Sequence, residues 1–314
     1  MDRLTAMRVF ITVVEKQGFS AASRALNIPL PSVSRKIAEL ESDLGVQLLT
    51  RSTRKVTVTD SGRRYYEDIR HILEDLDDAD RLVSGEYLSP KGHLRMTAPM
   101  LFGRLHMLPV IHDFLDQHPD VDIQLYLTDR VVDLLDEHVD LSLRIGPLPD
   151  SSLIASQAGV VRLIVCASPG YLAARGRPKT PDELGQHRCI FYHRAGAAAE
   201  WAFRMPSGEL RHFMTRARLM INSAEGSVYS AVRDGGLIQL LSYQAAPEVA
   251  AGRLEIVLSS FELPPYPVSI VYPQGRFVPQ KIRALIDFAM PRLRERLDTV
   301  EKQCRTRSPS QNRH

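Results

Sequence analysis

Cysteine is scarce in this sequence of 314 residues, which contains Cys166, Cys189 and Cys304 and no others. The three are far apart and form no C-x-x-C pair, which argues against a structural zinc site and a disulfide framework and favours a reducing cytosol. Long apolar runs are missing too, since no uncharged stretch approaches the roughly 20 residues that cross a membrane. The N-terminus, Met1-Asp2-Arg3, lacks the layout of a secretory signal. We therefore expect a cytoplasmic protein with no membrane segment and no metal.

The short motifs of the common enzyme classes are also missing. The sequence contains no H-E-x-x-H, G-x-S-x-G, G-x-x-x-x-G-K-[ST] or G-x-G-x-x-G, which mark zinc proteases, serine hydrolases, P-loop proteins and dinucleotide-binding domains. The histidines, including His106, His112 and His118, are scattered and lack the spacing of metal ligands. We expect neither an enzymatic activity nor a cofactor.

Charge is distributed unevenly along the chain. The whole sequence carries a net charge of +3, with 44% hydrophobic and 25% charged residues, as expected of a globular protein of about two domains. Residues 1–59 carry nine basic and five acidic side chains, a net charge of +4, which leaves −1 for the remainder. A small basic module joined to a near-neutral body is typical of a protein that meets a polyanion with one end. Charge alone does not separate this interpretation from an ordinary solvated surface.

Three short helices are predicted at the start of the chain. The first ends near Gly18, and its apolar face is Met7, Phe10, Ile11 and Val14. The second spans 20–26, with Ser20 as its N-cap. The third begins at Pro31, because proline at a first helical position needs no amide partner, and it ends at the C-terminal cap Gly45. The buried stripe of the third helix is Val33, Ile37, Leu40 and Leu44.

The exposed face of the third helix has the character of a DNA-reading helix. Arg35 can bond a guanine edge bidentately, while Ser32 and Ser34 can reach phosphates or bases. A plain three-helix bundle is the alternative, but the β-prone segments 48–50 and 55–58 that follow predict a hairpin wing with a basic tip. The candidate DNA-binding residues are Arg24, Pro31, Ser32, Ser34, Arg35, Lys36, Arg51, Thr53, Arg54 and Lys55.

In this region the sequence closely resembles the LysR-type transcriptional regulators. The matching segments are FITVVE (10–15), GFSAASRALN (18–27), VSRKI (33–37), LE (40–41), LGVQLL (44–49), RSTR (51–54) and TVTDSG (57–62). One departure is Leu30, since many members carry a polar residue, often glutamine, just before the helix-opening proline. The resemblance implies that residues 1–59 are a winged helix-turn-helix domain that binds a double-stranded DNA operator.

Residues 60–90 are predicted to form a linker helix and a hinge. Apolar residues alternate by four and three in a narrow seam: Tyr65, Ile69, Ile72, Leu76, Ala79 and Val83. In the family such a helix pairs antiparallel with its counterpart, which implies a homodimer or homotetramer. Packing against the body of its own chain is the alternative. The hinge is expected at 84–91.

The remainder alternates strand-like and helix-like segments, which predicts an α/β domain over residues 91–300. Strands are expected at 93–97, 121–127, 141–145, 163–167, 189–193, 219–221, 237–241 and 268–272, and helices at 102–117, 130–138, 227–233 and 280–296. Resemblance to LysR-type effector domains rests on GHLRMTAP (92–99), residues 109–114, HPDV (118–121), DRVVDL (129–134), VDL (139–141), RIG (144–146) and SPGYL (168–172). A late departure is Ser242, where proline is common.

The resemblance implies two α/β lobes like those of periplasmic binding proteins, lobe I at about 91–160 and 268–296 and lobe II at about 161–267. Such lobes hold a ligand at their strand ends. The candidate effector-binding residues are Thr97, Ala98, Pro99, Thr128, Asp129, Arg144, Asn222 and Ser223. Alternatively, Asp129 and Ser223 cap helices, and Arg144 pairs with a nearby carboxylate.

These patterns together predict a sequence-specific transcriptional regulator whose operator binding or DNA bending responds to a small organic effector, anionic or polar. A ligand-independent repressor with a vestigial pocket is the alternative, and RNA polymerase is a further candidate partner. An exported solute-binding protein would not carry the basic front module, and a non-specific DNA-architecture protein would leave more than two hundred residues unexplained. The segment 301–314 is polar and basic, with no acid after Glu301, and is predicted to be a disordered tail.

Overall fold

The computed structural model describes residues 2–51, 56–83, 89–148, 153–192, 200–214, 217–274 and 278–305. The chain separates into two compact units, with the boundary between Gly92 and His93. Across the described residues, no helix combines the length and apolar character needed to span a membrane.

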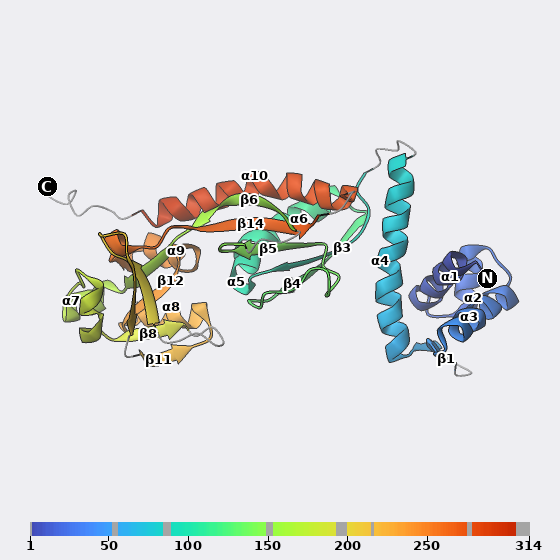
Figure 1. Cartoon of the computed structure of the whole chain (residues 1–314), viewed down its shortest axis with the longest axis horizontal. Coiled ribbons are helices and arrows are strands. Elements are labelled where there is room, and N and C mark those ends of the chain that lie inside the picture. The colour runs from blue at the N-terminus through green and yellow to red at the C-terminus, as the bar shows by residue number, and fades with distance from the viewer. Residues whose placement is uncertain are drawn as a thin grey trace. The chain divides into compact units, whose positions relative to one another are not determined.

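The N-terminal unit is a three-helix bundle followed by a two-stranded hairpin and a long helix (Figure 1). The elements are α1 (Arg3–Glu15), α2 (Phe19–Leu26), α3 (Leu30–Leu44), β1 (Leu49–Arg51), β2 (Val56–Val58) and α4 (Asp60–Val83). Strands β1 and β2 pair antiparallel and form the predicted wing. Gly45 adopts φ 68° and caps α3, as expected of a glycine in the left-handed region. The winged helix-turn-helix fold is confirmed.

The helix boundaries and faces differ in detail from the prediction. The buried face of α1 is Ala6, Val9, Phe10 and Val13, and the predicted Met7, Ile11 and Val14 pack only at the margin of the core. Helix α2 begins at Phe19, so Ser20 is inside the helix and is not its cap. Helix α3 begins one residue early, at Leu30, with Pro31 in its first turn. Because α1 contacts α2, α3 and α4 at once, its buried face is wider than a single stripe.

The first half of α4 belongs to the core of its own unit. Tyr65 packs against Phe10 with ring centroids 5.8 Å apart, and Ile69 is buried in the same cluster. Packing against its own body, the alternative left open above, therefore describes the start of the seam. Further along, the side chain of Ile72 is 54% exposed and Ala79 is exposed. Residues 84–88 of the predicted hinge lie outside the described residues.

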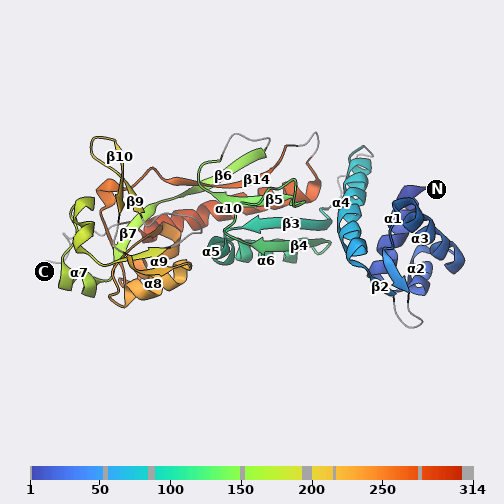
Figure 2. The same ribbon diagram turned by 60° about the horizontal axis from the view of Figure 1, so that its bottom comes forward.

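The C-terminal unit contains two five-stranded sheets, which confirms the two-lobed α/β architecture (Figure 2). Lobe I has the spatial order β4 (Val121–Leu127), β3 (Gly92–Ala98), β5 (Leu141–Ile145), β14 (Tyr266–Pro273) and β6 (Leu153–Val161). Lobe II has the order β11 (Ala217–Ile221), β8 (Cys189–Tyr192), β12 (Leu237–Leu241), β7 (Leu163–Ala167) and β13 (Glu255–Val257). The chain crosses between the lobes twice, from β6 to β7 and from β13 to β14.

Helices flank both sheets. In lobe I these are α5 (Met100–Phe102), a π-helical stretch (Gly103–Met107), α6 (Leu108–Gln117) and α10 (Gln280–Gln303). In lobe II they are α7 (Pro169–Arg175), α8 (Ala224–Val232) and α9 (Ser242–Ala250), with 3-10 turns at Pro181–Gln186 and Ser259–Phe261. A hairpin of β9 (Glu200–Arg204) and β10 (Leu210–Met214) also belongs to lobe II. Helix α10 runs along β6 and β14 (Figures 1 and 2).

The structure differs from the prediction in one helix, in four strands and at the C-terminal end of α10. Residues 130–138 contain a single turn rather than a helix: the carboxylate of Asp133 accepts the backbone N–H groups of Leu135 and Asp136 at its start, and His138, with φ 50°, ends it. Strands β6, β9, β10 and β13 were not predicted. Helix α10 continues to Gln303 and Cys304 is buried, so the first residues of the expected 301–314 tail are ordered. Residues 306–314 lie outside the described residues.

Candidate functional site

The exposed face of α3 presents an arginine to solvent. The side chain of Arg35 is 73% exposed, and the one ion pair found for it among the described residues, to Glu39 on the next turn, spans 3.8 Å. Surface pairs of this kind contribute little, so a phosphate or base can replace Glu39 at small cost. Pro31 and Arg24 are exposed as well, while Ser32, Ser34 and Lys36 are half-buried.

A short connection sets the angle between α2 and α3. Asn27 adopts the left-handed conformation at φ 54°, which ends α2. The hydroxyl of Ser23 donates to the carbonyl of Ile28 at 2.6 Å and so closes the turn. The chain then enters α3 with Arg24 and Arg35 on two consecutive helices, the arrangement of a helix-turn-helix reader.

The root of the wing is bonded to the end of α3. The carboxylate of Glu41 accepts the N–H groups of Leu48 and Leu49 at 2.8 and 2.9 Å. The hydroxyl of Thr59 donates to the carbonyl of Gln47 at 2.8 Å, which ties the other strand to the same root. Gly62 touches the root so closely that a Cβ there would lie 2.0 Å from the carbonyl oxygen of Leu48.

Sequence reasoning did not single out Glu41, although it is an acid on a basic module directly before the wing. Of the residues predicted on the wing, Arg51 lies in β1, and Thr53, Arg54 and Lys55 lie outside the described residues.

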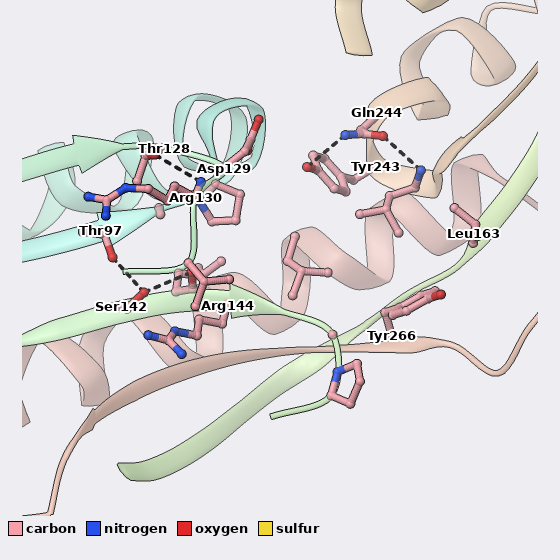
Figure 3. Close-up of a pocket in the computed structure, with 18 of the residues that line it drawn as sticks. Thr97, Thr128, Asp129, Arg130, Ser142, Arg144, Leu163, Tyr243, Gln244 and Tyr266 are labelled. Atoms are coloured by element: carbon pink, nitrogen blue, oxygen red, sulfur yellow. Dashed lines mark hydrogen bonds between the residues drawn. The ribbon is translucent and has the colours of Figure 1, made fainter. Parts of the chain in front are cut away.

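A cavity of about 570 Å³ lies between the two lobes (Figure 3). This volume is in the range of small-molecule sites in proteins. Six of the eight predicted effector residues line it: Thr97, Ala98, Pro99, Thr128, Asp129 and Arg144. The strand ends of lobe I therefore meet at one wall of the cavity, as their positions in the sequence indicated.

The wall from lobe I carries hydroxyls that are already bonded to one another. The hydroxyl of Thr97 donates to that of Ser142 at 2.8 Å, and both side chains are buried. The hydroxyl of Thr128 accepts the N–H of Arg130 at 3.2 Å. Two adjacent hydroxyls can donate or accept by rotation, so this wall suits a polar ligand group.

Asp129 lies in the cavity wall and also bonds the start of a helix. One carboxylate oxygen accepts the N–H of Met100 at 3.1 Å and so holds the start of α5, and the residue also lines the cavity. The other oxygen accepts the hydroxyl of Tyr192 at 3.5 Å. Since Tyr192 ends β8 in lobe II, this contact joins the two lobes at the cavity.

Two arginines supply positive charge to the cavity wall. Arg130 is paired with Glu137 at 2.9 Å. Arg144 donates to the carbonyl of Val132, and within the described residues it has no carboxylate partner. The described residues therefore do not support the alternative that Arg144 forms a structural ion pair. The charge of Arg144 is available to an anion.

The wall from lobe II consists of residues that sequence reasoning missed. Gln239 donates to the carbonyl of Ala202 at 3.3 Å, and Gln244 accepts the N–H of Leu241 at 3.0 Å. Tyr192 and Tyr243 also line the cavity from lobe II, and Tyr266, the first residue of β14, lines it from lobe I. Gln239 carried a usable signal, because it is the one polar residue in the otherwise aliphatic strand Leu237–Leu241.

The two effector residues predicted in lobe II do not line this cavity. Ser223 is the N-cap of α8 and accepts the N–H of Gly226 at 3.1 Å, which is the capping alternative. Asn222 is exposed beside it. The end of β11, where both residues lie, is at the edge of the sheet, whereas the cavity opens over β8 and β12.

An aromatic cluster lies where α5 and the π-helical stretch of lobe I meet α9 of lobe II. His106 lies 4.7 Å from Phe102 and 5.8 Å from Tyr243, measured between ring centroids. Within the described residues neither ring nitrogen of His106 has a hydrogen-bond partner. Burial, with a smaller effect of the nearby Arg296 charge, lowers the pKa of His106 to about 4.

No metal site is found within the described residues, where no three histidine, cysteine or acidic side chains gather suitably. Cys166, Cys189 and Cys304 are free and buried, and burial raises the pKa of each thiol. Protonated, inaccessible thiols are poor nucleophiles and poor ligands.

Both parts of the chain match families of known proteins. Residues 4–63 match the bacterial regulatory helix-turn-helix protein, lysR family, and residues 89–294 match the LysR substrate binding domain. The HTH-type transcriptional regulator PtxR of Pseudomonas aeruginosa is 35% identical over 285 residues, which cover 90% of this chain and 91% of that protein. The HTH-type transcriptional regulator YhjC of Escherichia coli is 33% identical over 299 residues, which cover 95% of this chain and 100% of that protein.

Solved structures agree with this assignment. The full-length Vibrio cholerae virulence activator AphB superposes with a TM-score of 0.58 at 29% identity, covering 92% of this chain and 98% of that one. CrgA from Neisseria meningitidis superposes with a TM-score of 0.54 at 28% identity, covering 95% and 98%. Because both of its domains match in order over nearly its whole length, this chain belongs to the LysR family of bacterial transcriptional regulators, with a DNA-binding helix-turn-helix and an effector-binding domain.

Proposed function

We propose that the cavity between the lobes binds a small organic anion and that this binding changes how the paired helix-turn-helix domains hold their operator. The observation that carries the proposal is Arg144, a guanidinium in the cavity wall without a carboxylate partner among the described residues. A ligand carboxylate supplies the missing charge, and the Thr97 and Ser142 hydroxyls offer further hydrogen bonds.

The rest of the lining supports a ligand with an apolar body. Tyr192, Tyr243 and Tyr266 present rings with polar tips, and Leu163 and Leu240 are aliphatic. Sites of this composition use a few polar groups for orientation and apolar contacts for affinity. The alternative, a pocket that no longer binds a ligand, is not favoured. A pocket without a ligand has no need of polar side chains, whereas this one is lined by Arg144 from lobe I and by Tyr192 and Tyr243 from lobe II.

For DNA, the proposed contacts are those of α3 and its neighbours. Arg35 reads base edges in the major groove, and Arg24, Pro31, Ser32, Ser34 and Lys36 position the helix on the duplex. Arg51, Thr53, Arg54 and Lys55 are proposed as wing contacts on the strength of the sequence. A protein with these contacts works on the bacterial chromosome, in the cytoplasm, with RNA polymerase as a further candidate partner.

We also propose a homodimer, or a tetramer built from it, on an interrupted inverted repeat. Support comes from the second half of α4, where Ile72 is 54% exposed on a helix whose first half is buried in its own unit. A second copy of α4 would cover this apolar residue. Two reading helices then match two half-sites.

A thermal-shift series tests the ligand proposal. Wild type is heated with acetate, pyruvate, succinate or benzoate, and an acid present at 100 times its Kd stabilises the protein by about 2.7 kcal/mol. Arg144→Met should abolish that shift, whereas Arg218→Met, an equal loss of charge on the exposed face of β11, should retain it. A full shift in Arg144→Met would remove Arg144 from the site.

A further inference from the structure

A single arginine lies at the junction of the two lobes. Arg162 follows β6 of lobe I and precedes β7 of lobe II, and Glu262 lies on the second crossover, between β13 and β14. One terminal guanidinium nitrogen of Arg162 donates to both carboxylate oxygens of Glu262, at 2.9 and 3.1 Å. The two side chains are 20% and 12% exposed. The ion pair therefore joins the two crossovers where solvent screens it little.

The end of α10 uses the remaining donors of the same guanidinium. The Nε of Arg162 donates to the carboxylate of Glu301 at 3.1 Å, and the other terminal nitrogen donates to the carbonyl of Cys304 at 2.9 Å. One turn earlier, Leu297 packs on Gly159 of β6, where a Cβ would lie 2.7 Å from its Cδ1. The match to the LysR substrate binding domain ends at residue 294. These contacts thus come from a part of the chain beyond that match.

The backbone of Arg162 is bonded to the start of α9. Its N–H donates to the hydroxyl of Ser242 at 3.1 Å, and its carbonyl accepts the N–H of Ser242 at 2.7 Å. A proline at position 242 would have no N–H and could not make the second bond. The thiol of Cys304 also donates to the carbonyl of Ser242, at 3.6 Å. The next two residues along α9, Tyr243 and Gln244, line the cavity.

We propose that Arg162, Glu262, Ser242 and the last turn of α10 form a hinge clamp that fixes the angle between the lobes and positions Tyr243 and Gln244 in the cavity. Arg162 is a positioning residue, since it does not line the cavity itself. Loosening the clamp lets the lobes sample more arrangements. The apparent ligand affinity then falls in proportion to the fraction of molecules that remain in the arrangement able to bind the ligand. That consequence rests on the proposed ligand site, whereas the clamp is a property of the ligand-free protein.

Hydrogen exchange of the ligand-free, full-length protein tests the clamp. Glu301→Gln keeps the shape of the side chain and removes the charge that faces Arg162. We expect the backbone amides of 240–246 and 159–164 to exchange several-fold faster, because the glutamine oxygen still accepts from Arg162 but lacks the charge that makes such a bond roughly twice as strong. Glu295→Gln, two turns earlier on the exposed side of α10, is the matched control and should leave both segments unchanged. Unchanged exchange in Glu301→Gln would overturn the proposal.

Spin-label distances give a second readout that general destabilisation would not produce. Labels are attached through Asp116→Cys in α6 and Arg175→Cys in α7, one in each lobe and both exposed. The native thiols stay unlabelled because they are buried, and burial raises the pKa of Cys189 to about 12. We expect a narrow distance distribution in the parent and a broader one in Glu301→Gln and Arg162→Met, with partial recovery in Arg162→Lys. Equal widths in all four would refute the clamp, whereas a lack of thermal shift with the four carboxylates would count against the ligand proposal alone.

Discussion

Among single residues, Arg35 is the one on which sequence selectivity is expected to depend. Its guanidinium is exposed on α3, and its one partner among the described residues is Glu39, at 3.8 Å. A bidentate contact to a guanine edge distinguishes base pairs, whereas contacts to phosphates do not. Selectivity and general affinity should therefore respond differently to substitutions on this domain.

Arg35→Ala should weaken binding to the site selected from randomised duplex DNA by about 1–3 kcal/mol, with little effect on random DNA. Lys16→Ala removes the same charge from an exposed position at the end of α1 and is the control, expected to lower affinity for both DNAs alike. Titration of labelled duplexes at one fixed salt concentration measures both. Equal, mild losses on selected and random DNA in Arg35→Ala would exclude it as the base reader.

His106 gives the C-terminal unit a dependence on pH. Its pKa of about 4 lies below the ordinary 6.5, so the unfolded chain binds the proton first as the pH falls. The neutral, buried imidazole therefore contributes fully to the free energy of unfolding above pH 6.5, and this contribution is lost as the pH falls from 6.5 to 4. Between pH 7.5 and pH 5 the free energy of unfolding should fall by about 2 kcal/mol for this reason. Urea unfolding followed through the single tryptophan, Trp201 in lobe II, should show this difference shrink in His106→Leu. The control is His112→Leu, at an exposed position of α6, in which the difference in unfolding free energy between the two pH values should persist. If the difference is undiminished in His106→Leu, His106 is not its source.

The cavity residues that were predicted from the sequence lie at strand ends, whereas those that were missed reach the cavity through tertiary packing. Thr97, Asp129 and Arg144 stand at the ends of strands in a recognisable pattern, so their meeting at one edge of a sheet could be anticipated. Tyr243 and Gln244 reach the cavity only through the packing of lobe II on lobe I, which local periodicity does not encode. The predicted Asn222 and Ser223 occupy a similar strand end, but on an edge strand away from the cavity.

At the scale of elements, strongly periodic segments were predicted well. Strands β4, β5, β7 and β12 have the predicted bounds, because each is a bounded apolar or alternating run. The segment 130–138 has helical spacing as well, but it forms a single turn, which begins at the Asp133 side chain and ends at His138 with φ 50°. In α4 the apolar seam from Tyr65 to Val83 was expected to pair with a second copy of the chain. Its first half, with Tyr65 and Ile69, instead completes the core of the helix-turn-helix domain.

Helix α4 carries the prediction about assembly. Ile72→Asp places a charge on its exposed apolar face and should shift the protein from dimer to monomer at micromolar concentration in light scattering. Ser61→Asp adds the same charge in the exposed first turn of α4 and should leave the mass unchanged. A monomeric wild type, or an Ile72→Asp variant of unchanged mass, would show that this helix does not pair.

At the scale of the whole molecule, we propose that an arginine-bearing cavity in one unit controls DNA binding by the other. A ligand changes DNA affinity only if it favours one arrangement of the protein over another. The coupling is reciprocal, so DNA must alter ligand affinity by the same factor. We propose that a small anion selects an arrangement through the hinge between the lobes.

The most direct test is the Kd of the selected operator duplex, measured with and without a saturating amount of the carboxylate that gives the largest thermal shift. We expect the Kd to change roughly 5- to 150-fold in wild type, the usual range of allosteric coupling, and not to change in Arg144→Met, whose DNA affinity without the acid should equal that of wild type. A carboxylate that binds the wild-type cavity and leaves the operator Kd unchanged, or an undiminished response in Arg144→Met, would contradict the proposed coupling.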